Sequence, residues 1–262
     1  MEIKEVVATL ERFAPLLLQE SYDNAGLQIG LTVGEEVSGV LLCLDVTEAV
    51  ITEAEAKGCN LIVAHHPLLF RPLHRVTTDT QVGRCVIQAV QKGIAIYAAH
   101  TNLDNAPGGV NYEIAQKLEM QDVHFLQPLS HGEGGSGVIG KLAQPLPAEC
   151  FLKQVAKIFG VEALMHNKVE HMVHTIALCG GSGEFLLDQA ISLGADAFIT
   201  GEMSYHRYFG HESDILIGVL GHYQSEQYTI QLLYRLLHDA YPTLRMYETS
   251  VNTNPIVYQC TL

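Results

Sequence analysis

The sequence predicts an α/β protein made of two three-layer α/β/α units with mixed, mostly parallel sheets. Two observations lead to this prediction: apolar runs of strand length alternate with helical segments, and the alternation restarts after a loop-like stretch at residues 127–137. Strands that are apolar throughout are typical of sheets covered by helices on both faces, because such strands leave no face for water. With 262 residues, of which 48% are hydrophobic, the chain can bury a large core.

The first half of the chain carries local signals for its elements. A helix is expected over residues 2–20, and the turn-prone stretch SYDNAGLQIG ends it. Thr47 is placed to cap a helix at 47–58, and Gly58 is placed to end that helix. The other elements expected here are strands at 37–45, 60–66 and 94–104 and a helix at 78–93.

The second half repeats the alternation. Its expected elements are strands at 137–147, 173–183, 195–202, 214–222 and 255–262 and helices at 148–160, 184–194 and 224–242. The periodicities of the two halves agree loosely, which fits two related units.

Composition narrows the class of protein. The formal net charge of −14 argues against nonspecific binding to nucleic acid or to anionic lipid, because no basic surplus exists to neutralise phosphates. The six cysteines show no C-x-x-C spacing, so we expect free thiols in a reducing cytoplasm rather than a disulfide framework. Neither a signal peptide nor a transmembrane helix is expected from the hydropathy pattern.

Histidines stand where the expected strands end, at the edge where open α/β sheets bind ligands. His65 and His66 close the strand NLIVAHH. Neighbouring side chains of a strand point to opposite faces, so the pair would serve two places at once, as a site with two metal ions requires. The plainer alternative, in which one histidine caps a helix and the other faces solvent, explains the dipeptide alone equally well.

Two further pairs follow other strands. His100 and Asp104 belong to HTNLD, whereas His222 and Glu226 are four residues apart at the start of a helix and therefore share a face. Taken alone, Asp104 fits a turn residue and Glu226 fits a carboxylate favoured at a helix start. Taken together with the histidine pair, they predict a metal site.

The combined donors indicate a centre with open coordination positions. They offer nitrogen and oxygen without a thiolate, which suits Zn, Fe, Mn, Ni or Co and argues against a closed structural zinc site. The expected protein ligands are His65, His66, Asp104, His222 and Glu226. Five ligands are too few to saturate two divalent ions. An open two-metal site lowers the pKa of a bound water and stabilises developing negative charge, which is hydrolytic chemistry.

Two more stretches carry polar or flexible residues after strands. In CGGSG, the amides of residues such as Gly181 and Gly183 could hold a phosphate at a helix start, but a tight turn is favoured because the Lys-Ser/Thr of a P-loop is missing. In TGEMSYH, Glu202 and His206 fit groups that support the metal ligands, groups that face the substrate, or a polar helix start.

The order and spacing of several blocks resemble the Nif-three-like family, whose members are named GTP cyclohydrolase 1 type 2 homologues and dinuclear-metal-centre hexameric proteins. The blocks, which together span nearly the whole chain, are SYDNAGLQIG, LDVTEAVITEA, LIVAHHPLLF, HTNLDNAPGGVN, CGGSG, ITGEM and GHYQSE. Two departures, Tyr22 where the family usually has tryptophan and the absence of an inserted third domain, involve none of the expected ligands.

The resemblance implies a specific architecture and site. It implies two intertwined α/β/α domains, which we place at 1–126 completed by 224–262 and at 127–223, assembled as a homohexamer. It implies that the five residues above bind two metal ions, with Glu226 bridging. It also places His100 beside the centre, where we expect an acid/base or supporting role.

The resemblance implies a metal-dependent hydrolase of a nucleotide or related small molecule, such as an enzyme that opens the purine ring of GTP. Hydrolysis of a phosphoester or cyclic amide would use the same ions. Glu202, Gly181 and Gly183 are the candidate substrate contacts. A different class of function stays open: a non-catalytic hexamer that binds metal for delivery or regulation.

Overall fold

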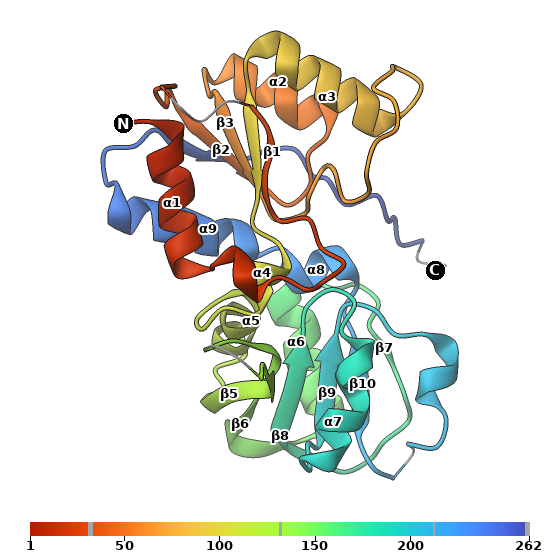
Figure 1. The fold of residues 1–262 in the computed structure, drawn as a ribbon. Helices are drawn as coiled ribbons and strands as arrows, with labels where there is room; N and C mark the ends of the chain where they lie inside the picture. The colour runs from red at the N-terminus through yellow and green to blue at the C-terminus, as the bar shows by residue number, and fades with distance from the viewer. Residues whose placement is uncertain (31–33, 131–132, 212, 260–262) are drawn as a thin grey trace. The chain divides into compact units, whose positions relative to one another are not determined.

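The computed structural model describes residues 1–30, 34–130, 133–211 and 213–259 (Figure 1). The chain divides into two compact units, each discontinuous in sequence: residues 1–103 with 229–254, and residues 104–228 with 255–262. The expected α/β class with two intertwined units is confirmed. In this division the chain crosses after residues 103, 228 and 254, whereas the sequence-based boundaries lie after 126 and 223.

The sheet of the first unit is mostly parallel. Its strands follow the order β1-β4-β3-β2-β11, with β1 antiparallel to β4 and the other neighbours parallel. The strands are β1 (Gly26–Ile29), β2 (Val40–Cys43), β3 (Leu61–Ala64), β4 (Ala95–Ala98) and β11 (Met246–Glu248). The three central strands are buried at every residue, because helices cover both faces.

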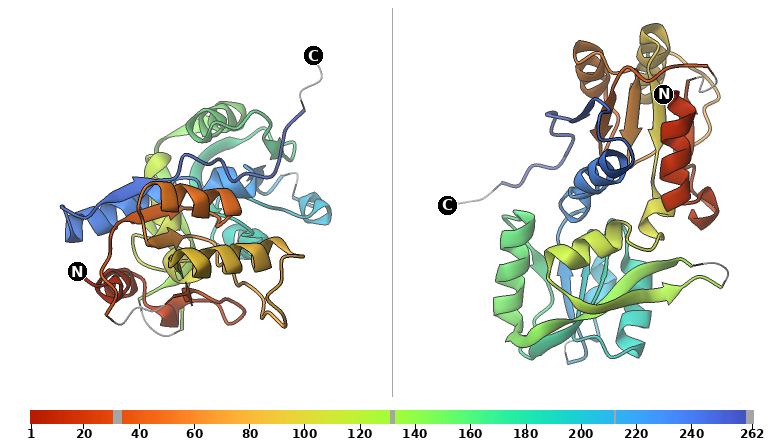
Figure 2. Two further views of the ribbon diagram at one scale, coloured as in Figure 1. Left: turned by 90° about the horizontal axis from the view of Figure 1, so that it is seen from above. Right: turned by 90° about the vertical axis from the view of Figure 1, so that its left-hand side faces the viewer.

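Two helix pairs form the outer layers of the first unit (Figure 2). Helices α2 (Glu48–Ala56) and α3 (Gln81–Lys92) pack together, and so do α1 (Ile3–Phe13) and α9 (Thr229–Ala240). Alternate residues of the central strands, Leu41, Ile62 and Ile96 among them, share one core cluster with α2 and α3. The alternation is the two-residue period of a strand, so the other residues face the opposite helix layer.

The sheet of the second unit has the order β5-β6-β8-β9-β10-β7. Parallel pairing is confined to β8, β9 and β10, and the outer pairings are antiparallel. The strands are β5 (Gln121–Pro128), β6 (Gly135–Pro147), β7 (Met165–His166), β8 (Met172–Cys179), β9 (Ala197–Thr200) and β10 (Leu216–Val219). Because β5 pairs along β6, residues 121–126 join this sheet rather than the first one.

Helices also cover the second sheet. Helices α5 (Val110–Lys117) and α6 (Ala148–Phe159) pack on β6 and β8. The short helix η2 (Glu184–Leu186) and α7 (Leu187–Ser192) share a core cluster with residues of β5, β6, β8, β9 and β10. The remaining helical segments are η1 (Leu16–Leu18), α4 (Thr101–Asp104), η3 (Tyr205–Tyr208) and α8 (His222–Glu226).

Three expected elements differ in extent from the structure. The expected helix at 2–20 ends at Phe13 as α1, and the short helix η1 follows it. The expected strand at 94–104 stops at Ala98, and HTNLD turns into α4 because the buried Asn102 accepts a hydrogen bond from the His100 amide and donates to the Ala14 carbonyl. The expected helix at 224–242 is two helices, α8 and α9. Between them, Gln227 and Tyr228 bind carbonyl oxygens at the end of α6.

The expected C-terminal strand at 255–262 is wrong over its described part, since residues 255–259 have no strand structure, and 260–262 lie outside the described residues. The three-residue β11 occupies the edge of the first sheet instead.

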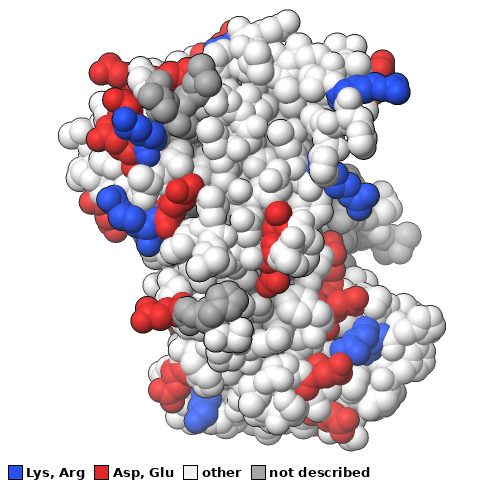
Figure 3. Space-filling model, viewed as in Figure 1, with Lys and Arg blue, Asp and Glu red and all other residues white. Residues whose placement is uncertain are grey.

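The state of the described cysteines and the distribution of basic side chains can be compared with what the composition predicts. The described cysteines, Cys43, Cys59, Cys85, Cys150 and Cys179, are free thiols. On the face drawn in Figure 3, the described Lys and Arg side chains are scattered rather than gathered into one patch. Among the described residues, no helix combines the length and apolar character needed to cross a membrane.

Candidate functional site

In the first unit, His65 and His66 directly follow β3. Their amides donate to the carbonyls of Cys43 and Leu44, so backbone pairing with the neighbouring strand continues past the end of β3. The two imidazole rings nevertheless lie side by side, with centroids 4.8 Å apart, rather than on opposite faces of the sheet. The chain has left regular strand geometry at this point, and the ring of His100 completes the group at 5.4 and 5.5 Å.

The hydrogen bond of His65 determines its tautomer. Its side chain is fully buried, and Nδ1 lies 2.8 Å from the carbonyl oxygen of Ala99. A carbonyl oxygen can only accept, so Nδ1 carries the proton and Nε2 carries a lone pair. Metal-binding histidines are commonly held in this way, with one ring nitrogen donating to an oxygen and the other directed to the metal.

Carboxylates hold the other two histidines of this cluster. His66 donates through Nδ1 to Asp45 at 2.8 Å, and Asp45 also accepts from the Thr253 hydroxyl at 2.7 Å. His100 donates through Nδ1 to Asp23 at 2.7 Å. Neither aspartate is among the functional residues predicted from the sequence. Their signals are positional: Asp45 follows the end of β2, and Asp23 belongs to SYDNAGLQIG.

Both aspartates are acidic for physical reasons. Burial raises the pKa of Asp23, but hydrogen bonds from His100 and Thr101 outweigh it and lower the pKa to about 2. Burial likewise raises the pKa of Asp45, and hydrogen bonds from His66 and Thr253 bring it below its usual value. Both carboxylates are therefore ionised at neutral pH and able to accept from the histidines.

In the second unit, α8 carries the expected pair His222 and Glu226. Glu226 is 4% exposed, and its Oε2 lies 3.2 Å from His222 Nε2. His222 Nδ1 lies 2.9 Å from Glu202, which also accepts from the Ser182 hydroxyl. If Nδ1 donates to Glu202, then Nε2 and the Glu226 carboxylate are two acceptors in contact, and only a proton or a metal ion between them makes this arrangement favourable.

The CGGSG loop packs directly against this pair. Gly181 has a φ of +58°, and a Cβ added there would lie 2.3 Å from Glu226 Oε1. Only glycine fits such a close approach in the left-handed region. The glycine at 181 is therefore needed because it leaves room for the buried carboxylate of Glu226.

The loop amides donate within the protein. Gly180 N donates to Asn111 Oδ1 at 3.0 Å, Gly181 N to Ser225 Oγ at 3.0 Å, and Gly183 N to Thr200 Oγ1 at 3.1 Å. These bonds favour the tight turn over an anion cradle. Asn111 also donates to the carbonyl of Asp104 at 3.1 Å and so links the HTNLD segment to the loop.

The described residues thus include donors suited to a metal ion. His65, His66 and Glu226 are a set of residues that could hold a metal ion. The nature of the set, with imidazole and carboxylate groups and no thiolate, fits Zn, Fe, Mn, Ni or Co.

Comparison with known proteins decides the family. The profile of the Duf34/NIF3 (NGG1p interacting factor 3) family matches residues 1–255. The chain belongs to the Duf34/NIF3 family. Two relatives, both named GTP cyclohydrolase 1 type 2 homolog, match along nearly their whole length. The protein from Lactococcus lactis is 35% identical, and the match covers 97% of this chain and 98% of the relative. The protein from Clostridium acetobutylicum is 30% identical, and the match covers 99% of this chain and 96% of the relative.

A solved Duf34/NIF3 structure has the same fold. The crystal structure of a Bacillus cereus protein related to NIF3 superposes with a TM-score of 0.89 and 25% identity, covering 99% of each chain.

Proposed function

We propose that this Duf34/NIF3 member is a cytoplasmic metal-dependent hydrolase that binds two divalent ions through His65, His66, Asp104, His222 and Glu226. The observation that carries the proposal is a repeated hydrogen-bond pattern. His65, His66, His100 and His222 each direct Nδ1 toward an oxygen acceptor, which is how histidines that bind metal through the other ring nitrogen are commonly held. Divalent ions bound there would supply Lewis acidity to a substrate carbonyl, phosphoryl group or ring carbon.

The protein's own residues supply proton transfer and orientation. With Nδ1–H directed to the ionised Asp23, His100 has a basic Nε2 that can accept a proton and return it, which is the acid/base role we propose for it. Glu202 holds His222 in place, so we propose an orienting role for this carboxylate. Gly181 and Gly183 would contribute through loop shape, because their amides are already used.

The names of the relatives support the substrate class that we propose. Their names refer to a GTP cyclohydrolase, and we propose a nucleotide or a related small molecule as substrate. We also propose a homohexamer, on the family resemblance. Size-exclusion chromatography with light scattering tests it, since six chains per particle supports the hexamer and a monomer rejects it.

A turnover assay tests the enzymatic proposal. The protein is stripped with a chelator, reloaded with Zn²⁺, Mn²⁺ or Fe²⁺, and incubated with GTP, a phosphodiester and a cyclic amide. We expect hydrolysis of one substrate class that requires metal, is lost in His100→Ala and is retained in His74→Ala, an exposed histidine of the same unit. Stoichiometric metal binding without turnover would instead support a metal-delivering or regulatory protein.

A further inference from the structure

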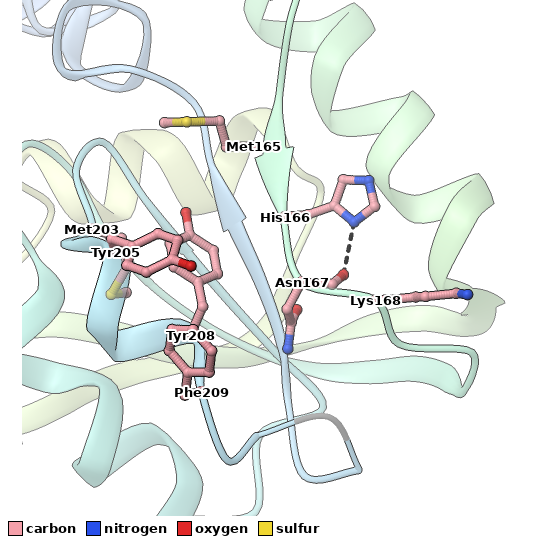
Figure 4. A pocket seen from close by; sticks show the side chains of 8 residues that line it. All are labelled: Met165, His166, Asn167, Lys168, Met203, Tyr205, Tyr208 and Phe209. Atoms are coloured by element: carbon pink, nitrogen blue, oxygen red, sulfur yellow. Dashed lines mark hydrogen bonds between the residues drawn. The ribbon is translucent and has the colours of Figure 1, made fainter.

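The second unit holds a pocket that involves none of the proposed metal ligands. Its volume is about 470 Å³, which is within the range of roughly 300–1,000 Å³ typical of small-molecule sites. Four of its residues come from the segment after β9, and four come from β7 and the residues after it (Figure 4). They are Met203, Tyr205, Tyr208 and Phe209, and Met165, His166, Asn167 and Lys168.

Aromatic and thioether side chains dominate the pocket wall. The rings of Tyr205 and Phe209 lie 5.2 Å apart in an edge-to-face arrangement. Tyr205 is 71% exposed, Met165 60% and Phe209 57%. Large apolar groups clustered at the surface commonly mark a binding site, and rings with sulfur neighbours suit a planar aromatic ligand.

Hydrogen bonds anchor the aromatic segment, so this wall is formed in advance. The amide and hydroxyl of Ser204 both donate to Glu184 at 2.7 Å. Arg207 donates to Asp188 of α7 at 3.1 Å.

The opposite wall is tied to the sheet. The buried Asn167 accepts from the Ile217 amide at 2.8 Å and donates to the Ile215 carbonyl at 2.9 Å. Rigid walls reduce the entropy cost of binding.

One polar group of the pocket indicates what the ligand must offer. The Tyr208 hydroxyl is buried, and among the described residues it has no hydrogen-bond partner. A buried hydroxyl without a partner is costly, and a ligand that accepts its proton would remove this cost. Figure 4 shows Lys168 extended away from the aromatic side chains, so the aromatic side of the pocket presents no cationic side chain among the eight lining residues.

We propose that this pocket binds a planar nitrogen heterocycle, which packs against Tyr205 and Phe209 and accepts a hydrogen bond from Tyr208. The proposal does not depend on the metal-dependent activity. The pocket and the metal ligands have one structural link, because Met203 of the pocket directly follows Glu202, which holds His222.

Ligand-observed NMR with two ring probes tests the proposal. Quinoline and its all-carbon analogue naphthalene are titrated against the full-length protein, and saturation transfer reports binding. We expect quinoline to bind, with Tyr205→Ala weakening it roughly three- to tenfold. Tyr208→Phe should weaken quinoline by a similar roughly three- to tenfold factor and leave naphthalene unchanged, because only quinoline carries an acceptor nitrogen.

Phe185→Ala is the matched control, since Phe185 is an aromatic residue of the same unit that is 56% exposed and outside the pocket. It should leave both affinities unchanged, and circular dichroism checks that every variant is folded. Absence of saturation transfer, or a signal that Tyr205→Ala does not reduce, would overturn the pocket assignment. An equal loss for both probes in Tyr208→Phe would overturn the hydrogen bond.

Discussion

At the scale of single residues, an oxygen acceptor decides what each histidine can do. The Ala99 carbonyl leaves His65 one chemical option, a protonated Nδ1 and a lone pair on Nε2. Asp45 and Asp23 impose the same orientation on His66 and His100. The residue types of the ligands are readable in the sequence, whereas their tautomers and orientation follow only from these contacts.

The contact from Asp45 predicts a loss of metal affinity on substitution. Asp45→Asn keeps the shape but removes the charge that holds His66, so we expect metal affinity to fall about 10- to 100-fold. Titration against a fluorescent chelator measures it. The control Asp79→Asn changes an exposed aspartate of the same unit and should leave the affinity unchanged. Equal affinities in both variants would show that Asp45 does not orient a ligand.

The low pKa of Asp23 predicts acid sensitivity. Its pKa is about 2 in the folded protein and 3.8 in its unperturbed state, so the folded state binds fewer protons. Its stabilising contribution is complete above pH about 4 and is lost as the pH falls through the folded pKa.

Urea unfolding at pH 6 and pH 3 tests this dependence. When the pH is lowered from 6 to 3, the free energy of unfolding of the wild type should fall by on the order of 1 kcal/mol more than that of Asp23→Asn. A constant difference between wild type and variant across this range would contradict the assignment.

At the scale of elements, the loop between β8 and η2 is the tight turn that the sequence favours, but its glycine at 181 is required by a neighbour that the sequence does not reveal. CGGSG reads as a phosphate loop or a tight turn, and the structure shows a turn whose glycine at 181 admits Glu226. The sequence contains the glycines but not their neighbour, because Glu226 is far away in the chain.

A pair of glycine substitutions separates backbone strain from crowding. Gly181→Ala and Gly194→Ala both place a side chain at positive φ, +58° and +72°, but among the described residues a Cβ at 194 has nothing within 4 Å. We expect Gly194→Ala to lower the free energy of unfolding by about 1 kcal/mol. Gly181→Ala should cost about 1–3 kcal/mol more and also weaken metal binding, because Glu226 must move. Equal losses in urea unfolding would contradict the role given to Gly181.

Elements with strong local signals were predicted well, and those that depend on distant partners were not. The helix at 47–58 is confirmed as α2, with Thr47 accepting from the Val50 amide as its cap. The strand β11 has three residues and exists because it pairs with β2, which no local pattern reveals. The break between α8 and α9 likewise depends on hydrogen bonds to the distant end of α6.

At the scale of the whole molecule, the path of the chain between the two units determines which unit each proposed ligand belongs to. The chain passes from the first unit to the second after residue 103, returns after 228 and crosses again after 254. The proposed ligands come from both units, His65 and His66 from the first and Asp104, His222 and Glu226 from the second. We propose that all five bind one pair of ions.

Metal content per chain tests that claim most directly. Elemental mass spectrometry is applied to the native protein, to His66→Ala and Glu226→Ala, and to the exposed controls His74→Ala and Glu149→Ala. We predict about two ions per chain in the native protein and in both controls. Each ligand variant should bind clearly less metal, because the proposed two-metal site needs the ligands of the first unit and those of the second. Absence of bound metal after loading with Zn²⁺, Mn²⁺ or Fe²⁺, or equal content in all five proteins, would contradict the account.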